Sequence, residues 1–205
     1  MIPDAIAYTL PSPTRPGPAP WKVDPARCVL LVHDMQRYFA ERFDPSVSPG
    51  RELFANVGRL RAACTKLQIP VRYTAQPGRM TRAERGLLHD VWGDGMHDDE
   101  GGLVFEPAAA SEVVTKWRYS AFHRTPLLGM LRELGRDQLV VCGVYAHLGC
   151  LLTACDAYAH DIEPFLVADA IADFTAADHA LALDFASRSC AVTPTTEEVL
   201  GSLGD

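Results

Sequence analysis

The stretch that most constrains the fold runs from residue 140 to residue 160. It begins with the short apolar run Val140-Val-Cys142, is interrupted by Gly143, and takes up helical spacing from Leu151 onward. This order predicts a strand, a tight turn and the start of a helix. In an open parallel sheet such a junction is where ligands bind, because free backbone N–H groups and the positive end of the helix dipole face the ligand.

The rest of the chain repeats this alternation of strand and helix. Apolar runs predict strands at 28–33, 69–74, 113–115, 139–143, 164–168 and 190–193, and helical spacing predicts helices at 51–68, 126–134, 151–160, 175–188 and from 196. The polar stretch 79–102 is predicted to be a long functional loop with a short helix inside it. Right-handed crossovers then give an α/β fold, a doubly wound six-stranded parallel sheet with helices on both faces, arranged as a Rossmann-like three-layer sandwich.

The chain of 205 residues suits one domain with a sizeable core. We expect that domain at 27–205, preceded by a Pro-rich arm at 1–26. Five prolines between residues 11 and 20 favour an extended arm that lies over the domain or over a partner subunit.

Composition and missing motifs narrow the function. The net charge of −7 without a basic stripe argues against nucleic acid, and the apolar runs are too short for a membrane span. The start of the chain does not resemble a secretion signal, so we expect a cytoplasmic protein. Six scattered cysteines without a C-x-x-C pair, and three dispersed histidines (His33, His147, His160), predict neither a disulfide framework nor a metal site. Phosphate-binding glycine motifs and G-x-S-x-G are absent, and we expect no cofactor.

Four polar features fall at the carboxyl ends of predicted strands. Asp34 ends the first strand, Gln76 follows the second, Lys116 ends the third, and Val144-Tyr145 follows the fourth. A single acidic residue at a strand end is more often a cap or a surface charge. Four polar features on the ligand edge of one parallel sheet instead predict a binding or catalytic site.

Several segments in this order resemble the isochorismatase family. They are Leu31-Val-His-Asp-Met-Gln-Arg-Tyr-Phe39, Tyr73-Thr-Ala-Gln-Pro77, Thr115-Lys-Trp-Arg-Tyr-Ser-Ala-Phe-His123, Gly143-Val-Tyr-Ala-His147 and Asp161 to Phe174, and the resemblance extends from Ala7 to Leu200. It implies a six-stranded parallel α/β fold, which agrees with the independent prediction above. It also implies a homodimer and a cis peptide bond between Val144 and Tyr145.

One position separates two branches of that family. Cysteine hydrolases of the family use an Asp-Lys-Cys triad, with the cysteine six residues after the glycine of a pattern resembling G-V-A-T-x-x-C. In this chain the sixth residue after Gly143 is Gly149, and Cys150 comes one residue later. One residue turns a helix by about 100°, so Cys150 is expected to point away from the site. The chain therefore resembles the isochorismatase branch, which hydrolyses a vinyl ether without a thiol nucleophile.

The resemblance assigns roles to residues at this edge. Asp34 is expected to act as general acid with its proton retained through burial beside Phe39 and Trp92. Lys116 either shares a proton with Asp34 or contacts the substrate, and the sequence leaves this open. Expected substrate contacts are Gln76, Arg85, Lys116, Tyr119 and the backbone N–H of Tyr145, with Trp92 covering the substrate ring. Judged by residue type alone, Arg85 is as compatible with a solvated loop charge, Trp92 with a loop anchor and Tyr119 with the core.

We therefore expect a small-molecule hydrolase that cleaves the enolpyruvyl ether of 2-amino-2-deoxyisochorismate, of isochorismate, or of both. The products are pyruvate and trans-2,3-dihydro-3-hydroxyanthranilate or 2,3-dihydro-2,3-dihydroxybenzoate. Similarity to stand-alone members of phenazine-type secondary metabolism, and a chain that ends at Asp205 without a carrier domain, favour the amino substrate. The alternatives are a siderophore-type isochorismatase, a cysteine amidohydrolase that uses Cys150, and a non-catalytic dimeric scaffold.

Overall fold

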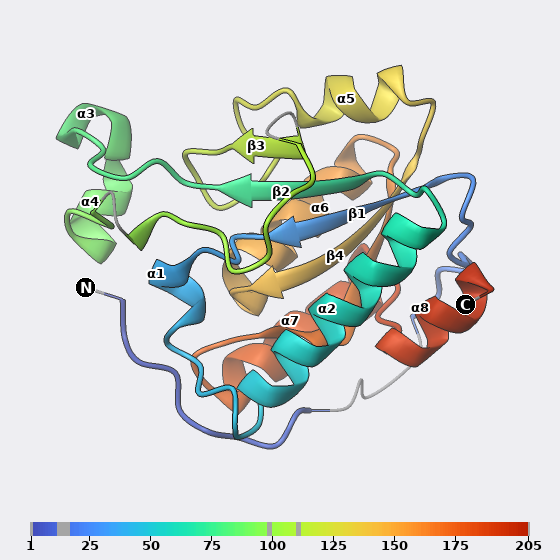
Figure 1. Cartoon of the computed structure of the whole chain (residues 1–205), viewed down its shortest axis with the longest axis horizontal. Helices are drawn as coiled ribbons and strands as arrows, with labels where there is room; N and C mark the ends of the chain where they lie inside the picture. Colours follow the sequence, from blue (N-terminus) through green and yellow to red (C-terminus); the bar gives the residue numbers. More distant parts are fainter. Residues whose placement is uncertain (1, 12–16, 98–99, 110–111, 205) are drawn as a thin grey trace.

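The fold is built around a parallel sheet of five strands, seen in a computed structural model that describes residues 2–11, 17–97, 100–109 and 112–204. The strands are β1 (Cys28–His33), β2 (Val71–Ala75), β3 (Val113–Thr115), β4 (Gln138–Val144) and β5 (Glu163–Ala172). They lie in the order β3-β2-β1-β4-β5, and every pair is parallel (Figure 1). The chain therefore winds outward from β1 in both directions, as predicted for a doubly wound sheet.

Helices cover both faces of this sheet (Figure 1). The longer helices are α2 (Gly50–Lys66), α5 (Leu127–Glu133), α6 (Leu151–Ala159), α7 (Ala176–Ser189) and α8 (Thr196–Leu203). Apolar residues of α2 and α8 share one core cluster, and those of α5, α6 and α7 share the other. Strand β1 contributes residues to both clusters. Leu30 and Val32 belong to the first, and Val29 and Leu31 belong to the second, because successive side chains of a strand point to opposite faces of the sheet.

Short helices surround the carboxyl ends of the strands. They are α1 (Arg37–Ala40), α3 (Arg82–Arg85), α4 (Leu87–Trp92) and η3 (Ala146–Cys150), the last a turn of π-helix that leads directly into α6. The predicted loop 79–102 thus contains two short helices rather than one. Thr81 begins α3 with a capping box, in which its side chain accepts from the backbone of Glu84 and the Glu84 side chain accepts in return.

The prediction of a sixth strand at 190–193 is wrong in this structure. Val192 forms only an isolated parallel bridge with Phe165 of β5. Its N–H donates to the Pro164 carbonyl and its own carbonyl accepts from Leu166, but two residues later the chain reaches Pro194. The Pro194 carbonyl still accepts from the N–H of Ala168 at 2.8 Å, but proline has no N–H to donate back to β5, so a full two-way ladder does not form.

The described part of the N-terminal arm lies on its own domain. The N–H of Ile6 donates to the Phe174 carbonyl, and the N–H of Tyr8 donates to the Ser48 carbonyl. The Tyr8 hydroxyl accepts from the N–H of Asp173 at 2.9 Å and meets the ring of His179 at 3.0 Å. Within the described residues, no helix combines the length and apolar character needed to cross a membrane.

Candidate active site

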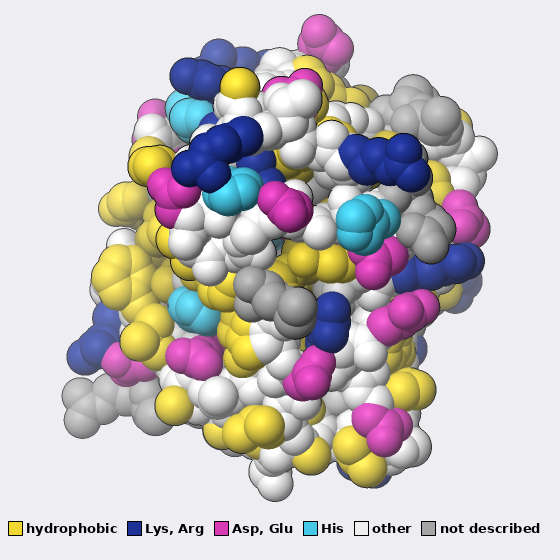
Figure 2. Space-filling model, turned by 90° about the vertical axis from the view of Figure 1, so that its left-hand side faces the viewer, with side chains coloured by type: hydrophobic (Ala, Val, Ile, Leu, Met, Phe, Trp, Pro, Cys, Tyr) yellow, Lys and Arg dark blue, Asp and Glu magenta, His cyan; other side chains and the backbone are white. Residues whose placement is uncertain are grey.

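A pocket opens at the carboxyl ends of β1 and β4, where the winding of the sheet reverses. Figure 2 looks onto this edge and shows hydrophobic side chains near its centre with charged side chains around them. All nine residues that the sequence assigned to the site line this pocket: Asp34, Phe39, Gln76, Arg85, Trp92, Lys116, Tyr119, Tyr145 and Gly149. The pocket is also lined by Val144, which the sequence placed at this edge together with Tyr145, and by four residues that sequence reasoning missed: Ile2, Leu88, Leu148 and Phe174. The peptide between Val144 and Tyr145 is cis, as expected from the resemblance.

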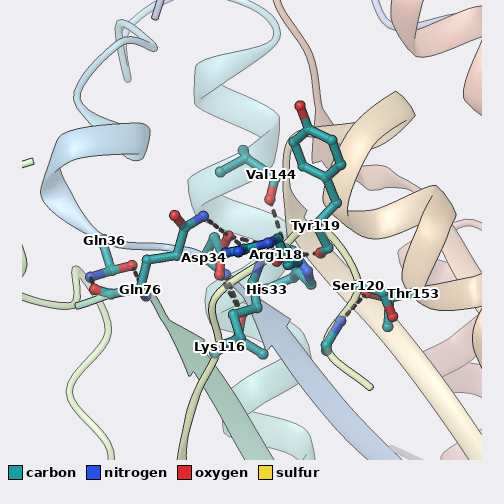
Figure 3. A network of polar contacts seen from close by, with 12 residues as sticks. His33, Asp34, Gln36, Gln76, Lys116, Arg118, Tyr119, Ser120, Val144 and Thr153 are labelled. Carbon is teal, nitrogen blue, oxygen red and sulfur yellow. Dashed lines mark hydrogen bonds and ion pairs between the residues drawn. The ribbon is translucent and has the colours of Figure 1, made fainter. Parts of the chain in front are cut away.

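Asp34 and Lys116 form a direct ion pair at the floor of the pocket (Figure 3). The Lys116 Nζ lies 2.8 Å from the Asp34 Oδ2, and the lysine is fully buried. The ammonium also donates to the carbonyls of Arg118 and Tyr119, at 2.8 and 3.1 Å. Three acceptors satisfy the three donors of an ammonium group, so a charged Lys116 is well accommodated despite its burial.

The surroundings of Asp34 favour its carboxylate form in the free enzyme. Burial alone would raise the pKa of this carboxyl, but the Lys116 ammonium, the neighbouring His33 and hydrogen bonds from Lys116 and Thr74 outweigh burial and hold the pKa below its usual value. The Thr74 hydroxyl donates to Asp34 Oδ1 at 2.6 Å. The sequence-based expectation that burial keeps Asp34 protonated is therefore wrong for the free enzyme, because the lysine lies in direct contact.

Gln76 reaches the same carboxylate from the end of β2. Its Nε2 donates to Asp34 Oδ2 at 3.2 Å. The backbone of Gln76 is held on both sides by Gln36, whose Oε1 accepts from the Gln76 N–H at 2.7 Å and whose Nε2 donates to the Gln76 carbonyl at 3.0 Å (Figure 3). Gln36 is buried and sequence reasoning gave it no role, although it lies two residues after Asp34. It is a positioning residue for the Gln76 loop.

Arg85 comes from the last turn of α3 and is buried with a relative exposure of 5%. Among the residues that the structure describes, its hydrogen-bond partner is the Gly93 carbonyl. A Cβ at Gly95 would lie 2.5 Å from the Arg85 guanidinium, so glycine, here at φ +89°, leaves the room for this side chain. Burial lowers the pKa of Arg85, but a guanidinium keeps its charge in proteins. The pocket thus holds a buried cation without a carboxylate partner among the described residues, which suits an anionic ligand.

Aromatic rings form the walls of the pocket. Tyr145 stacks on Phe174 with ring centroids 4.1 Å apart, and Phe39 meets Tyr145 edge to face at 6.1 Å. Trp92 lies 6.2 Å from Phe174 and donates its indole N–H to the Tyr119 hydroxyl at 2.6 Å. The walls therefore suit a flat or partly unsaturated ring, held above the charged floor.

The thiol of Cys150 lies outside this pocket. Cys150 is fully buried in the core cluster on the α6 face, and burial raises the pKa of its thiol well above the usual value. Its neighbour Gly149 faces the pocket instead. This is the geometry expected from the one-residue offset in the sequence, and it argues against Cys150 as a nucleophile.

We predict that Cys150→Ala leaves hydrolase activity nearly intact. The thiol lies in the core cluster and does not line the pocket, so its loss is expected to cost about 1 kcal/mol of unfolding free energy. It is expected to change kcat/KM by less than about threefold, a small effect on the scale of transition-state binding. Steady-state kinetics and thermal unfolding on one preparation measure both. A loss of activity with an unchanged melting temperature would contradict this prediction and restore the cysteine hydrolase alternative.

Comparison with known proteins places this geometry in a family. The model of the isochorismatase domain matches residues 28–198, from the start of β1 into α8. The chain belongs to the isochorismatase family. It is 50% identical over 205 residues to phenazine biosynthesis protein PhzD1 of Pseudomonas aeruginosa, covering 97% of this chain and 98% of that protein.

The chain is also similar to a second curated protein and to a solved structure. The isochorismatase of Bacillus subtilis is 49% identical over 187 residues, which cover 89% of this chain and 60% of that longer protein. The crystal structure of a cysteine hydrolase from Pseudomonas syringae pv. phaseolicola superposes with a TM-score of 0.80 at 23% identity, over 93% of this chain and 98% of that one. At 23% identity, this superposition supports the fold of the chain and nothing beyond the fold. Family and relatives together make the chain a hydrolase of the isochorismatase type.

Proposed function

We propose that this protein hydrolyses the enolpyruvyl ether of 2-amino-2-deoxyisochorismate, of isochorismate, or of both, in a pathway of secondary metabolism. The observation that carries the proposal is the buried Asp34–Lys116 pair in a pocket where the expected nucleophile position is a glycine, Gly149. Such a site offers a proton donor and a fixed positive charge but no thiol. Relatives that are called a phenazine biosynthesis protein and an isochorismatase match at nearly equal identity, so both substrates stay in the proposal.

In the proposed reaction, Asp34 moves one proton to carbon and regains it from water. The protonated carboxyl of Asp34 donates to the terminal methylene of the enolpyruvyl group, which becomes a methyl group and leaves an oxocarbenium ion. Water adds to that cation while the Asp34 carboxylate takes up a proton from it. The hemiketal then breaks its C–O bond to the ring: its hydroxyl loses a proton as the C=O of pyruvate forms, and the ring oxygen gains a proton and leaves as an alcohol. One water is consumed, and no electrons are exchanged.

The substrate itself supplies the reason for Asp34 to become protonated. Its two carboxylates bring negative charge into a low-dielectric pocket beside the Asp34 carboxylate, and a like charge nearby raises a carboxyl pKa. Asp34 takes up this proton from solvent as the substrate binds, and the Lys116 ammonium, 2.8 Å away, remains the fixed positive charge. We infer that the free enzyme holds the charged pair and that the bound enzyme holds a neutral Asp34.

Arg85 is proposed to bind a substrate carboxylate, and Gln76 to position the ether against Asp34. The support is the burial of the Arg85 guanidinium without an acidic partner among the described side chains. The Gln76 Nε2 lies at the Asp34 carboxylate, so that side chain also contacts whatever approaches the acid. The aromatic walls around Tyr145 would then enclose the ring.

We predict that Arg85→Gln raises KM more than it lowers kcat. A charge-assisted hydrogen bond is worth roughly 1.5–3 kcal/mol, so kcat/KM is expected to fall by about 10- to 100-fold. Arg82→Gln is the matched control, because Arg82 lies on the same helix but is exposed and pairs with Asp90. Michaelis–Menten kinetics of both variants test this. Equal KM values for Arg85→Gln and Arg82→Gln would contradict the proposed carboxylate contact.

The function is tested by pyruvate release from the two substrates side by side under identical conditions. We expect release from at least one, and the ratio of the two kcat/KM values assigns the pathway. Stoichiometric pyruvate with a ring alcohol product, identified by mass spectrometry, supports ether hydrolysis. Absence of pyruvate from both substrates with folded enzyme would overturn the proposal and favour the scaffold alternative.

We also propose that the enzyme is a homodimer. Support comes from pairs of exposed apolar residues spaced four apart on one helix face: Leu87 and Val91 on α4, and Leu181 and Phe185 on α7. Light scattering after gel filtration is expected to give twice the chain mass of 22.4 kDa. Leu181→Glu/Phe185→Glu and Leu87→Glu/Val91→Glu then test which face holds the second copy. A monomeric wild-type protein at micromolar concentration would refute the dimer.

A cytoplasmic location is part of the same proposal. All six cysteines are free thiols, and five of them are buried, which suits a reducing compartment. Fractionation of the producing cell, with a known cytoplasmic enzyme as marker, tests the location.

A further inference from the structure

His33 is a fully buried histidine directly before Asp34, and the mechanism above leaves it without a role. It is the last residue of β1, the central strand. Its Nδ1 lies 2.8 Å from the Val144 carbonyl at the end of β4 (Figure 3). Burial lowers the pKa of His33 to about 4, so the ring is neutral at neutral pH and Nδ1 carries the hydrogen that is donated to Val144.

The other ring nitrogen of His33 gives no polar reason for the position of this side chain. Its Nε2 has no hydrogen-bond partner among the described residues, although it is buried. An unpaired buried acceptor disfavours folding. The ring does not line the pocket, so it is not placed to touch a substrate. A role for His33 must therefore act through the residues around it.

The His33 ring lies directly beside Gly149. A Cβ at position 149 would fall 2.2 Å from Cε1 of His33, 2.9 Å from Nε2 and 3.0 Å from Nδ1. Contacts under 3.0 Å require one of the two groups to move. The imidazole cannot swing freely, because it is enclosed on all sides and its Nδ1 is bonded to Val144. The ring therefore fills the space that any side chain at position 149 would need.

Gly149 lines the same pocket as Asp34 and Lys116. A side chain at 149 would thus begin at the wall of this pocket, in the space that the His33 ring now fills, and that ring lies beside the acid, with its Nδ1 3.9 Å from Asp34 Oδ2. We propose that His33 is a specificity-determining positioning residue: by filling the side-chain space of position 149, it keeps that position a glycine and restricts the pocket to chemistry without a nucleophile. The statement about reaction type rests on the proposed function, whereas the steric statement does not.

The test is a double-mutant cycle of Gly149→Ala and His33→Ala, with Gly129→Ala as the matched control. Gly129 lies inside α5, and a Cβ there meets nothing within 4 Å. Gly129→Ala is expected to keep kcat/KM and to keep or raise the melting temperature. Gly149→Ala is expected to lower the melting temperature by about 5 °C or more, as overpacking does, and to lower kcat/KM at least about tenfold through displacement of the neighbouring groups.

The decisive result concerns the double variant. With the imidazole removed, the new methyl group has space, so His33→Ala/Gly149→Ala is expected to melt higher than Gly149→Ala, a strong departure from additivity. If Gly149→Ala melts and reacts like Gly129→Ala, or if the double variant is no more stable than Gly149→Ala, the proposal is overturned. If Gly149→Ala alone does not fold, a folded double variant supports the proposal. If His33→Ala folds but the double variant does not, the proposal is overturned.

A thiol at position 149 gives a readout that is independent of hydrolase activity. In His33→Ala/Gly149→Cys, the new cysteine is expected to react with iodoacetamide at least about tenfold faster than the adjacent Cys150, which is buried in the core. Peptide mapping by mass spectrometry separates the two sites. Equal, slow labelling of both cysteines would show that position 149 does not enter the pocket and would contradict the proposal even if wild-type enzyme releases pyruvate.

Discussion

Asp34→Asn is expected to lower kcat for pyruvate release by roughly 10²- to 10⁴-fold, the usual contribution of a general acid or base. Asparagine keeps the size of the side chain and an oxygen that accepts from Thr74 or Lys116, but it has no acidic proton for the methylene carbon. KM is expected to change much less than kcat, because substrate carboxylates are bound elsewhere in the pocket. Single-turnover and steady-state assays of pyruvate release measure both quantities.

Asp169→Asn provides the matched control for this substitution. Asp169 accepts from the backbone N–H and the hydroxyl of Thr196 at 2.6 and 2.7 Å, at the start of α8 and outside the pocket. Loss of that charge is expected to lower stability while kcat stays within about twofold, since helix caps contribute about 1 kcal/mol to stability. A kcat for Asp34→Asn within threefold of wild type would rule out Asp34 as the acid, whatever the control shows.

The positions of Asp34, Gln76 and Lys116 were predictable because strands and their ends leave a strong mark in sequence. Short β-branched runs predict the strands, and a parallel sheet brings their carboxyl ends to one edge. Polar residues that follow these strands therefore lie close together. The same logic failed at 190–193, where the apolar run looks like a strand in sequence but forms only an isolated bridge to β5, because Pro194 has no N–H to donate. Whether a short apolar run forms a strand depends on its backbone pairing with the neighbouring strand.

Other features depend on distances that a sequence does not contain. The ionisation of Asp34 is decided by an ammonium 2.8 Å away, and sequence spacing could not distinguish this contact from a lysine that faces the substrate. Ile2 lines the pocket only because the arm folds back over the domain. His33 lies beside Gly149 across 116 positions of sequence, and nothing in either residue type indicates that their atoms compete for one space.

Lys116→Met is expected to give the largest loss of stability of any variant considered. It removes the ammonium but leaves the Asp34 carboxylate buried with Thr74 and Gln76 as its remaining partners. Breaking a buried pair by removing one partner costs about 3–5 kcal/mol, which lowers the melting temperature of a chain of this size by roughly 6–20 °C. Lys22→Met, the same change at an exposed lysine, is expected to leave the melting temperature nearly unchanged.

The pH dependence identifies the cause of that loss. In the wild-type protein the pKa of Asp34 is lowered, so its contribution to stability is present above the pKa of unfolded aspartate, about 3.9, and is lost as the pH falls through the lower folded value. Without Lys116, burial raises the folded pKa above 3.9, and the sign reverses. The variant is then expected to lose stability as the pH rises from about 4 through that raised pKa, so its difference from wild type is smallest in acid.

The double variant Asp34→Asn/Lys116→Met separates lost charge from lost packing. With a neutral amide in place of the carboxylate, no charge is left uncompensated, and the double variant is expected to melt above Lys116→Met at pH 8. Thermal unfolding of the wild type, both single variants and the double variant between pH 4 and pH 8 completes the cycle. A pH-independent loss in Lys116→Met that the second substitution does not relieve would mean that Lys116 stabilises the fold through its carbonyl contacts with Arg118 and Tyr119 rather than through Asp34.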